Sequence, residues 1–206
     1  MKVLLLNGSP RENGNTSIAL NEMVQVFNKN EIETEVISVG KEQIKGCQAC
    51  KACRKLGKCV IDDIVNEVAE RLKESDGFVI GSPVYFASAN GTLVSLLDRL
   101  FYSINYDTKM KVGASVAVAR RGGCSATFDE LNKYFTISGM PVASSQYWNS
   151  VHGQNIGEAE GDLEGLQTMR ELANNMSFLI KAIALGKEKF GIPSLNEDRT
   201  MTNFIK

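Results

Sequence analysis

The sequence predicts a single α/β domain in which a parallel β-sheet is covered on both faces by helices. Five short apolar runs alternate along the chain with five longer amphipathic stretches, and this order implies parallel pairing with right-handed crossovers. The chain has 206 residues, a usual size for one domain with one core. We therefore expect a doubly wound sheet.

The first half of the chain contains three predicted strands and two predicted helices. Residues 2–8, KVLLLNG, form a nearly continuous apolar run, which is typical of a strand buried on both faces. Residues 33–39 and the first part of 76–86 are similar short runs that predict strands. Residues 16–29 and 63–75 repeat apolar side chains at helical spacing, which predicts amphipathic helices.

The second half continues the alternation. Residues 90–103 and 125–139 have the apolar spacing of helices, and 111–119, KVGASVAVA, reads as a buried strand. A fifth strand is predicted at 141–148 and a long last helix at 162–185.

Domain boundaries follow from these elements. Residues 1–190 form the predicted domain, with a cysteine-rich insert at 46–59. Residues 191–206 have weak periodicity and contain Gly and Pro, so we expect an extended C-terminal arm.

The composition limits the classes of partner that the protein is expected to bind. The formal net charge is -1 and 23% of residues are charged, so no overall charge bias favours nucleic acid or an anionic membrane. The N-terminus lacks the regions of a secretory signal, and no run of about 18 apolar residues occurs. We expect a soluble cytoplasmic protein with no nucleic-acid or membrane partner.

The loop after the first strand, residues 7–17 with the sequence NGSPRENGNTS, predicts an anion site. Its glycines permit a sharp turn, and the free amides at the start of the following helix point into the same space. Arg11 adds a planar cation suited to phosphate. The loop lacks the lysine of a P-loop and the spacing of GxGxxG. A plain helix cap on a flexible turn is the alternative.

The loop at 81–91, GSPVYFASANG, follows the third strand. Pro83 stiffens it. Its backbone could meet the polar edge of a flat ring while Tyr85 or Phe86 packs on a face. The alternative is an aromatic pair that covers the end of the sheet.

The loop at 119–125, ARRGGCS, follows the fourth strand. Its adjacent glycines permit close approach of a ligand, and Arg120 and Arg121 bring positive charge. We give Cys124 a structural role, because an unpaired cysteine without a nearby histidine is weak evidence for catalysis. His152, the single histidine, is interpreted as a loop residue.

Four of the five cysteines, Cys47, Cys50, Cys53 and Cys59, lie within 13 consecutive residues in a CxxCxxCx5C pattern. In a reducing compartment, such clusters bind metal or perform redox chemistry more often than they form disulfides. The spacing lets three thiolates converge from one turn while a fourth returns from a short loop. We interpret the run as a site for a 4Fe-4S cluster, with a zinc site and free or redox-switching thiols as alternatives.

Together these motifs resemble a known family. GSPRENGNTS, GSPVYF followed by ANGTLVSLLDR, and ARRGG have the order and spacing of the flavodoxin-like NAD(P)H-dependent FMN reductases, and the cysteine run resembles the iron-sulfur flavoproteins within that superfamily. The resemblance implies a flavodoxin-like, five-stranded parallel sheet. It implies FMN phosphate on the first loop, held by Ser9, Arg11, Asn15, Thr16 and Ser17. It implies the flavin ring between the other two loops, held by Pro83, Val84, Tyr85, Phe86, Ala119, Gly122 and Gly123.

The predicted function is electron transfer between the two cofactors. The cysteine run follows the second strand, so we expect a cluster near the FMN at the same edge of the sheet. Flavin accepts two electrons as a hydride and can release them singly, whereas a cluster carries one at a time. No general acid, general base or nucleophile stands out, which fits chemistry carried by cofactors.

Partners and competing functions follow from the same motifs. NAD(P)H or ferredoxin is the expected electron donor or acceptor, and basic residues around the thiols could dock an acidic carrier. The long last helix and the family resemblance predict a homodimer or homotetramer. The alternatives are a cluster-free NAD(P)H-dependent FMN, quinone or nitro-compound reductase, and a non-catalytic interaction module stapled by zinc.

Overall fold

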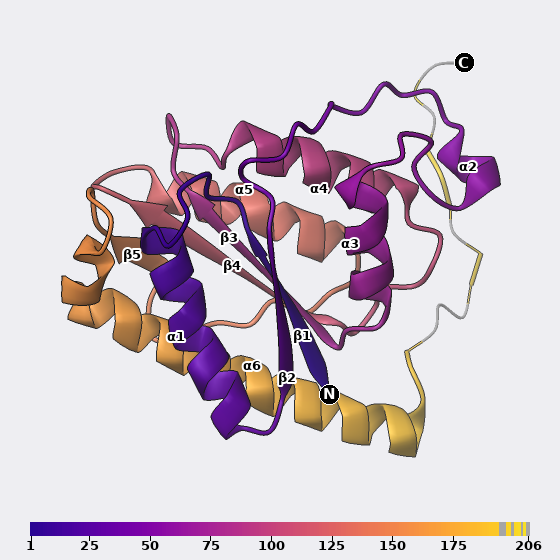
Figure 1. The fold of residues 1–206 in the computed structure, drawn as a ribbon. Helices are drawn as coiled ribbons and strands as arrows, with labels where there is room; N and C mark the ends of the chain where they lie inside the picture. Colours follow the sequence, from indigo (N-terminus) through magenta and orange to yellow (C-terminus); the bar gives the residue numbers. More distant parts are fainter. Residues whose placement is uncertain (194–196, 199, 203, 205–206) are drawn as a thin grey trace.

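The computed structural model describes residues 1–193, 197–198, 200–202 and 204. These residues form a five-stranded parallel sheet in the order β2-β1-β3-β4-β5 (Figure 1), which confirms the predicted architecture. The strands are β1 (Lys2–Asn7), β2 (Glu33–Ser38), β3 (Gly77–Pro83), β4 (Val112–Ala119) and β5 (Ser150–His152). The helices are α1 (Asn15–Lys29), α2 (Cys53–Leu56), α3 (Ile64–Lys73), α4 (Gly91–Ser103), α5 (Cys124–Ile137), the 3-10 turn η1 (Glu158–Gly161) and α6 (Leu163–Phe190).

The prediction of the fifth strand at 141–148 is wrong. Val142 forms only an isolated bridge with Gly113 of β4, and the chain pairs with β4 again at Ser150–His152. Between these points Tyr147 and Trp148 are exposed, so their apolar character does not reflect burial in the sheet. The short α2 within the cysteine run was not predicted, and α6 extends five residues beyond the predicted end at 185.

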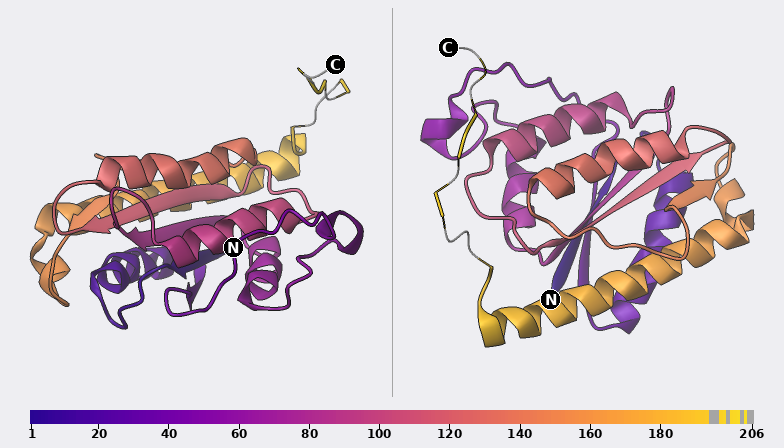
Figure 2. Two further views of the ribbon diagram at one scale, coloured as in Figure 1. Left: turned by 90° about the horizontal axis from the view of Figure 1, so that it is seen from above. Right: turned by 180° about the vertical axis from the view of Figure 1, so that it is seen from behind.

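Helices cover both faces of the sheet (Figure 2), and a cluster of core residues lies on each face. Alternate residues of β1 point to opposite faces, as the pleat of a strand requires. Val3 and Leu5 pack with α1 and α6, whereas Leu4 and Leu6 pack with α3, α4 and α5. This two-sided burial explains why the strands are apolar runs rather than alternating patterns.

Strand order reverses between β1 and β3, because β2 lies on one side of β1 and the later strands lie on the other. In open α/β sheets the crevice at such a point, beyond the carboxyl ends of the strands, is the usual ligand site. The loops after β1, β3 and β4 meet there. Among the described helices, none is both long and apolar enough to cross a membrane. In the predicted arm, residues 194–196, 199, 203 and 205–206 lie outside the described residues.

Candidate functional site

A pocket lies at the carboxyl edge of the sheet, where the three predicted loops converge. Eight of the twelve predicted flavin-site residues line it. They are Ser9, Arg11, Asn15, Thr16, Pro83, Val84, Tyr85 and Ala119, and the rest of the lining is Val118, Arg120, Gly153 and Gln154. We refer to it as the sheet-edge pocket.

The other four predicted residues lie around this pocket rather than in its lining. Ser17 lines an adjoining hollow on the outer side of the first loop. Phe86 is fully exposed. Gly122 and Gly123 lie in the connection between β4 and α5.

Asn7, at the end of β1, organises the first loop. Its Oδ1 accepts from the Ser9 amide at 3.0 Å, and its Nδ2 donates to the Ser17 hydroxyl at 3.0 Å. Asn7 is 4% exposed, so these bonds are shielded from water. Sequence analysis assigned Asn7 no role, although an amide side chain that ends an apolar strand is a usable indication.

The start of α1 presents free amides to the pocket. Its N-cap, Gly14, supplies no side-chain acceptor, and the first turn has no acidic residue. Within the part of the chain that the structure describes, the amides of Asn15, Thr16 and Ser17 have no hydrogen-bond acceptor. Unpaired amides at the positive end of a helix form an anion site.

A fourth wall, residues 153–159, was missed by sequence analysis. Arg11 Nη1 donates to the Gln154 carbonyl at 2.9 Å. Asn15 Nδ2 donates to the Asn155 carbonyl at 2.8 Å, and Asn15 Oδ1 accepts from the Ala159 amide at 3.2 Å. The Asn15 side chain therefore holds this wall in place, which leaves its backbone amide to face an anion.

The second loop contains a strained turn. Tyr85 and Ser88 exchange backbone hydrogen bonds of 2.9 and 3.1 Å. The residues between them, Phe86 and Ala87, have φ values of 53° and 61°. A left-handed conformation is unfavourable for such residues, and such strain is concentrated at functional sites. Glu130 of α5 stabilises the turn by accepting from the Ser88 hydroxyl and the Ala89 amide.

Gly123 closes the third loop onto the second. Its φ is 95°, and a Cβ there would lie 2.9 Å from both Ala87 Cα and Val84 Cγ1. Only glycine combines this conformation with this approach. At Gly122 a Cβ would meet no atom of the described residues within 4 Å, so the loop packing gives no reason for glycine there.

The view of Cys124 as a cysteine without a nearby histidine is corrected by the structure. Its Sγ is 4.0 Å from His152 Nε2, and His152 Nδ1 is 3.4 Å from Asp162 Oδ2. Burial, and then the Asp162 carboxylate, raise the pKa of the Cys124 thiol. The contact was not predictable from spacing, because 28 residues separate Cys124 and His152.

A second pocket brings the four clustered cysteines together. Its lining comprises Cys47, Gln48, Cys50, Lys51, Cys53, Cys59, Val60, Ile61, Arg99, Tyr102 and Ser103. We refer to it as the cysteine pocket. All five cysteines of the chain are free thiols.

The cysteine pocket is not beside the sheet-edge pocket, contrary to expectation. It is lined by the last turns of α4, whereas the strained turn precedes the first turn of α4. The connection after β2 runs along α4 to α2 instead of staying at the sheet edge (Figure 1). The two pockets share no lining residue, and α4, which has 13 residues and is therefore about 20 Å long, runs from near the strained turn to the cysteine pocket.

Arg99 forms the inner wall of the cysteine pocket and is 1% exposed. It donates to Asp63 at 2.6 and 2.9 Å and to Cys59 Sγ at 3.3 and 3.2 Å. Burial opposes its charge, but the bonds to Asp63 and Cys59 outweigh this and raise the pKa of the guanidinium. Sequence analysis missed Arg99, although an arginine inside the apolar run LLDRLF was an available indication.

Backbone conformation shapes the cysteine segment. Ala49 and Lys51 have φ values of 51° and 60°, and Gly57 has a φ of 70°. These left-handed residues fall between the cysteines and turn the chain around the pocket. Within the described residues, no group of three or more His, Cys, Asp or Glu side chains converges closely enough to hold a metal ion. The thiols therefore surround a common space without meeting at one point.

Known proteins with similar sequences include FMN reductases and iron-sulfur flavoproteins. The sequence profile of the NADPH-dependent FMN reductase family matches residues 1–155. An iron-sulfur flavoprotein of Methanocaldococcus jannaschii is 36% identical over 191 residues, covering 89% of this chain and 99% of that protein. An iron-sulfur flavoprotein of Methanosarcina thermophila is 31% identical over 193 residues, covering 92% and 100%.

Solved structures show the same fold at low sequence identity. A structure of RosB with a bound riboflavin-phosphate intermediate matches with a TM-score of 0.69 at 20% identity, covering 100% of this chain and 92% of that one. An archaeal flavodoxin matches with a TM-score of 0.59 at 15% identity, covering 88% and 99%. The flavodoxin-like fold expected from the sequence is thereby confirmed.

Proposed function

The chain belongs to the NADPH-dependent FMN reductase family and, within it, to the iron-sulfur flavoproteins, and from this premise we propose that it couples two-electron flavin chemistry to a one-electron 4Fe-4S cluster. Membership makes the protein a flavin-dependent oxidoreductase with FMN as its cofactor. The observation that carries the proposal is that four free thiols surround one pocket that contains a buried guanidinium.

In this proposal the FMN phosphate occupies the first loop. The amides at the start of α1, the Ser9, Thr16 and Ser17 hydroxyls and the Arg11 guanidinium supply donors suited to a dianion. The ring lies against the second and third loops, where Pro83 to Phe86, Ala119, Gly122 and Gly123 are its predicted neighbours. FMN, when bound, supplies hydride chemistry, and the chain binds and orients it.

The donor set of the cysteine pocket fits an iron-sulfur cluster. Each thiolate of such a cluster binds a different iron atom, so the four sulfurs stay further apart than around one zinc ion. The four thiols line one pocket, and the relatives that the chain matches are named iron-sulfur flavoproteins, which supports a cluster over zinc.

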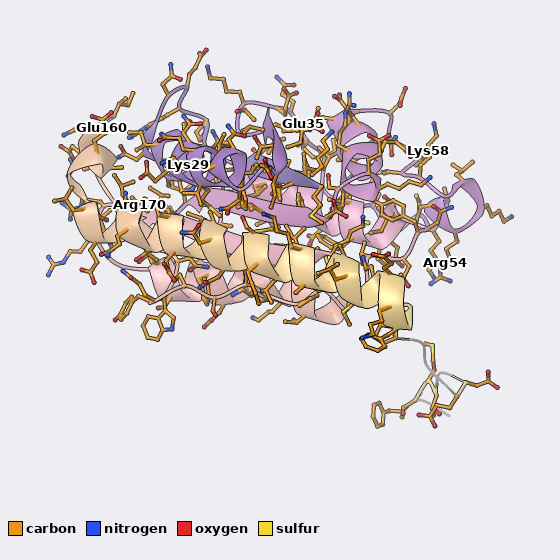
Figure 3. All side chains as sticks on the ribbon, turned by 90° about the horizontal axis from the view of Figure 1, so that it is seen from below. Lys29, Glu35, Arg54, Lys58, Glu160 and Arg170 are labelled. Atoms are coloured by element: carbon orange, nitrogen blue, oxygen red, sulfur yellow. The ribbon has the colours of Figure 1, made fainter. Side chains whose placement is uncertain are left out.

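The surface around the thiols suits an acidic electron carrier. Lys51, Arg54, Lys55 and Lys58 are exposed, and Arg54 and Lys58 project from the end of the molecule that carries α2 (Figure 3). Positive charge at such a site steers an acidic partner and strengthens docking at low salt. Ferredoxin is the partner class we propose here, and NAD(P)H is the donor class proposed for the flavin.

A second candidate is a cluster-free NAD(P)H-dependent FMN, quinone or nitro-compound reductase. The exposure of Cys47 and Cys50 favours it, because accessible thiols can serve as a redox switch.

An anaerobic absorbance and electron paramagnetic resonance spectrum with metal analysis separates these candidates. The proposal expects FMN together with about four irons and four acid-labile sulfides per chain. Flavin without iron after anaerobic reconstitution would select the cluster-free reductase. Zinc without flavin and without turnover of NAD(P)H would select the interaction module.

We also propose that the protein is a cytoplasmic homodimer or homotetramer. The free thiols suit a reducing compartment. Phe178 and Leu185, which lie two turns apart on α6, are 72% and 67% exposed, and a second copy would cover them. Light scattering checks this, since a particle of 22.5 kDa would show a monomer.

A further inference from the structure

Cys59 is the most firmly held of the four clustered cysteines. Its backbone amide donates to Asn66 Oδ1 at 3.0 Å, and Asn66 Nδ2 donates back to its carbonyl at 3.1 Å. Its Sγ receives the two hydrogen bonds from Arg99. Cys59 is thus fixed at both backbone and sulfur before any metal binds.

The other three cysteines lack such support. Cys53 Sγ is 3.7 Å from the Tyr102 carbonyl, which can only accept a bond. The thiols of Cys47 and Cys50 are exposed and have no hydrogen-bond partner among the residues that the structure describes. Among the described residues, only Cys59 receives hydrogen bonds from a cation, so the four ligands are not equivalent.

We infer that Arg99 is a positioning residue that acts through Cys59 to hold one corner of the cluster and to raise the reduction potential of that cluster. The inference rests on the proposed function, because it requires a cluster. A reduced cluster carries one more negative charge than an oxidised one. Donors to its sulfurs and nearby positive charge therefore stabilise the reduced form.

The burial of Arg99 makes this effect large. Bonds from an ionised donor are about twice as strong as neutral ones, and water does not screen a charge that is 1% exposed. The guanidinium fork is also locked by the Lys45 and Ile61 carbonyls at 3.3 and 3.1 Å. A lysine in its place has no planar fork that can reach Asp63 and Cys59 together.

Asp63 acts in the opposite direction on the same cluster. Its carboxylate pairs with Arg99 and offsets part of the positive charge. Its Oδ1 also caps α3 by accepting from the Val65 amide at 3.1 Å. Asn is as good a cap as Asp, so Asp63→Asn removes the charge while keeping the cap.

The test is a redox titration of the anaerobically purified full-length protein, followed by electron paramagnetic resonance. Arg99→Lys is expected to retain its irons and to favour the oxidised cluster by about tenfold, a shift of about 59 mV to more negative potential for a one-electron couple. Asp63→Asn is expected to shift the potential to a more positive value. The matched control is Arg54→Gln, which removes an exposed charge next to Cys53 and is expected to shift the potential less than Arg99→Lys does.

The outcomes separate this inference from the proposed function. A wild-type protein without a cluster overturns both. A wild-type cluster whose potential is the same in Arg99→Lys and Asp63→Asn overturns only the inference. If Arg99→Lys loses its iron, its reduction potential cannot be measured, and the Asp63→Asn variant then tests the inference. A more positive potential in Asp63→Asn supports the role of Arg99. An unchanged or more negative potential overturns it.

Discussion

The two pockets are built in different ways. The sheet-edge pocket is assembled by topology, because the ends of β1, β3 and β4 and the segment after β5 all lie at one edge. Its walls are joined by bonds such as those of Asn15 and Arg11 to residues 153–159. The cysteine pocket is lined by the end of α4 and by Cys53 of the short helix α2, and residues 43–51 of the remaining wall have no regular secondary structure.

The shape of each pocket therefore has a different structural origin. The sheet-edge pocket should persist without its ligand, since the sheet holds its walls. The cysteine pocket depends on Arg99, on three left-handed residues and on whatever the thiols bind. The two sites should therefore respond independently to substitution.

The largest expected effect is the loss of one cofactor with retention of the other. Cys50→Ser removes a soft thiolate ligand, so the cluster should be lost or damaged while FMN remains bound. Reduction of the flavin by a hydride donor should survive, whereas one-electron exchange with a ferredoxin-like protein should fall sharply. Iron, sulfide and flavin analysis measures this.

The matched control for that variant is Cys124→Ser, which changes the one cysteine outside the run and should leave iron content unchanged. An unchanged iron content in Cys50→Ser would show that the interpretation of the clustered thiols as cluster ligands is wrong. If variants of all four clustered cysteines lose FMN and unfold together, the run is a structural staple and zinc becomes the better interpretation.

The converse substitution affects the sheet-edge pocket alone. Ser9→Ala combined with Arg11→Ala should weaken FMN binding by about 1.5 to 3 kcal/mol, roughly ten- to a hundredfold, because charge-assisted contacts to a dianion are lost. Iron content should not change. Arg121→Ala, an exposed arginine outside the pocket lining, is the control. Equal FMN affinity in the double variant and the wild type would rule out this phosphate site.

A smaller effect is expected at Gly40, where the connection after β2 passes the first loop. A Cβ at Gly40 would overlap the backbone of Ser9 and Pro10, so Gly40→Ala should lower the free energy of unfolding by about 1 to 3 kcal/mol and weaken FMN binding. Gly46→Ala is the control, because a Cβ there meets no atom within 4 Å in the part of the chain that the structure describes. Urea denaturation measures the free energy of unfolding of both variants. An equal loss of stability in Gly40→Ala and Gly46→Ala would contradict the packing argument.

The smallest effect concerns the reactivity of Cys124. Its raised pKa keeps the thiol protonated at pH values where an ordinary cysteine has begun to ionise. The rate of alkylation by iodoacetamide should therefore rise at higher pH than for a free cysteine, as peptide mapping at Cys124 can show. Asp162→Asn removes the second cause of the shift, so its profile should move to lower pH. A profile that matches free cysteine would refute the effect of burial.

The sequence predicted the sheet and most of the sheet-edge pocket for a physical reason. Strand and helix periodicities are local, and parallel topology then carries the loops after successive strands to one edge. The first loop was recognised because Arg11 and the polar residues near it are adjacent in sequence. The wall formed by residues 153–159 was missed because its bonds to Arg11 and Asn15 span more than 130 residues.

The position of the cysteine pocket was predicted incorrectly for a related reason. Topology fixes where a strand ends, but it does not fix the path of a long connection after that point. The 14 residues between the end of β2 and the start of α2 are enough to carry the thiols along α4. The buried pair of Arg99 and Asp63 that receives them is recognisable only once α3 and α4 are packed together.

The irregular segment before α2 has a consequence for the lifetime of the protein. Lys45 and Lys51 are exposed and lie within it, and trypsin-like proteases cut first at lysines in exposed chain without regular structure. A cluster bound to Cys47 and Cys50 would tie the second half of this segment to Cys53 of α2 and to Cys59, which Arg99 of α4 holds, and would shield it from a protease. Limited trypsin digestion would then report how many chains carry their metal, and in a cell the chains without metal would be degraded first.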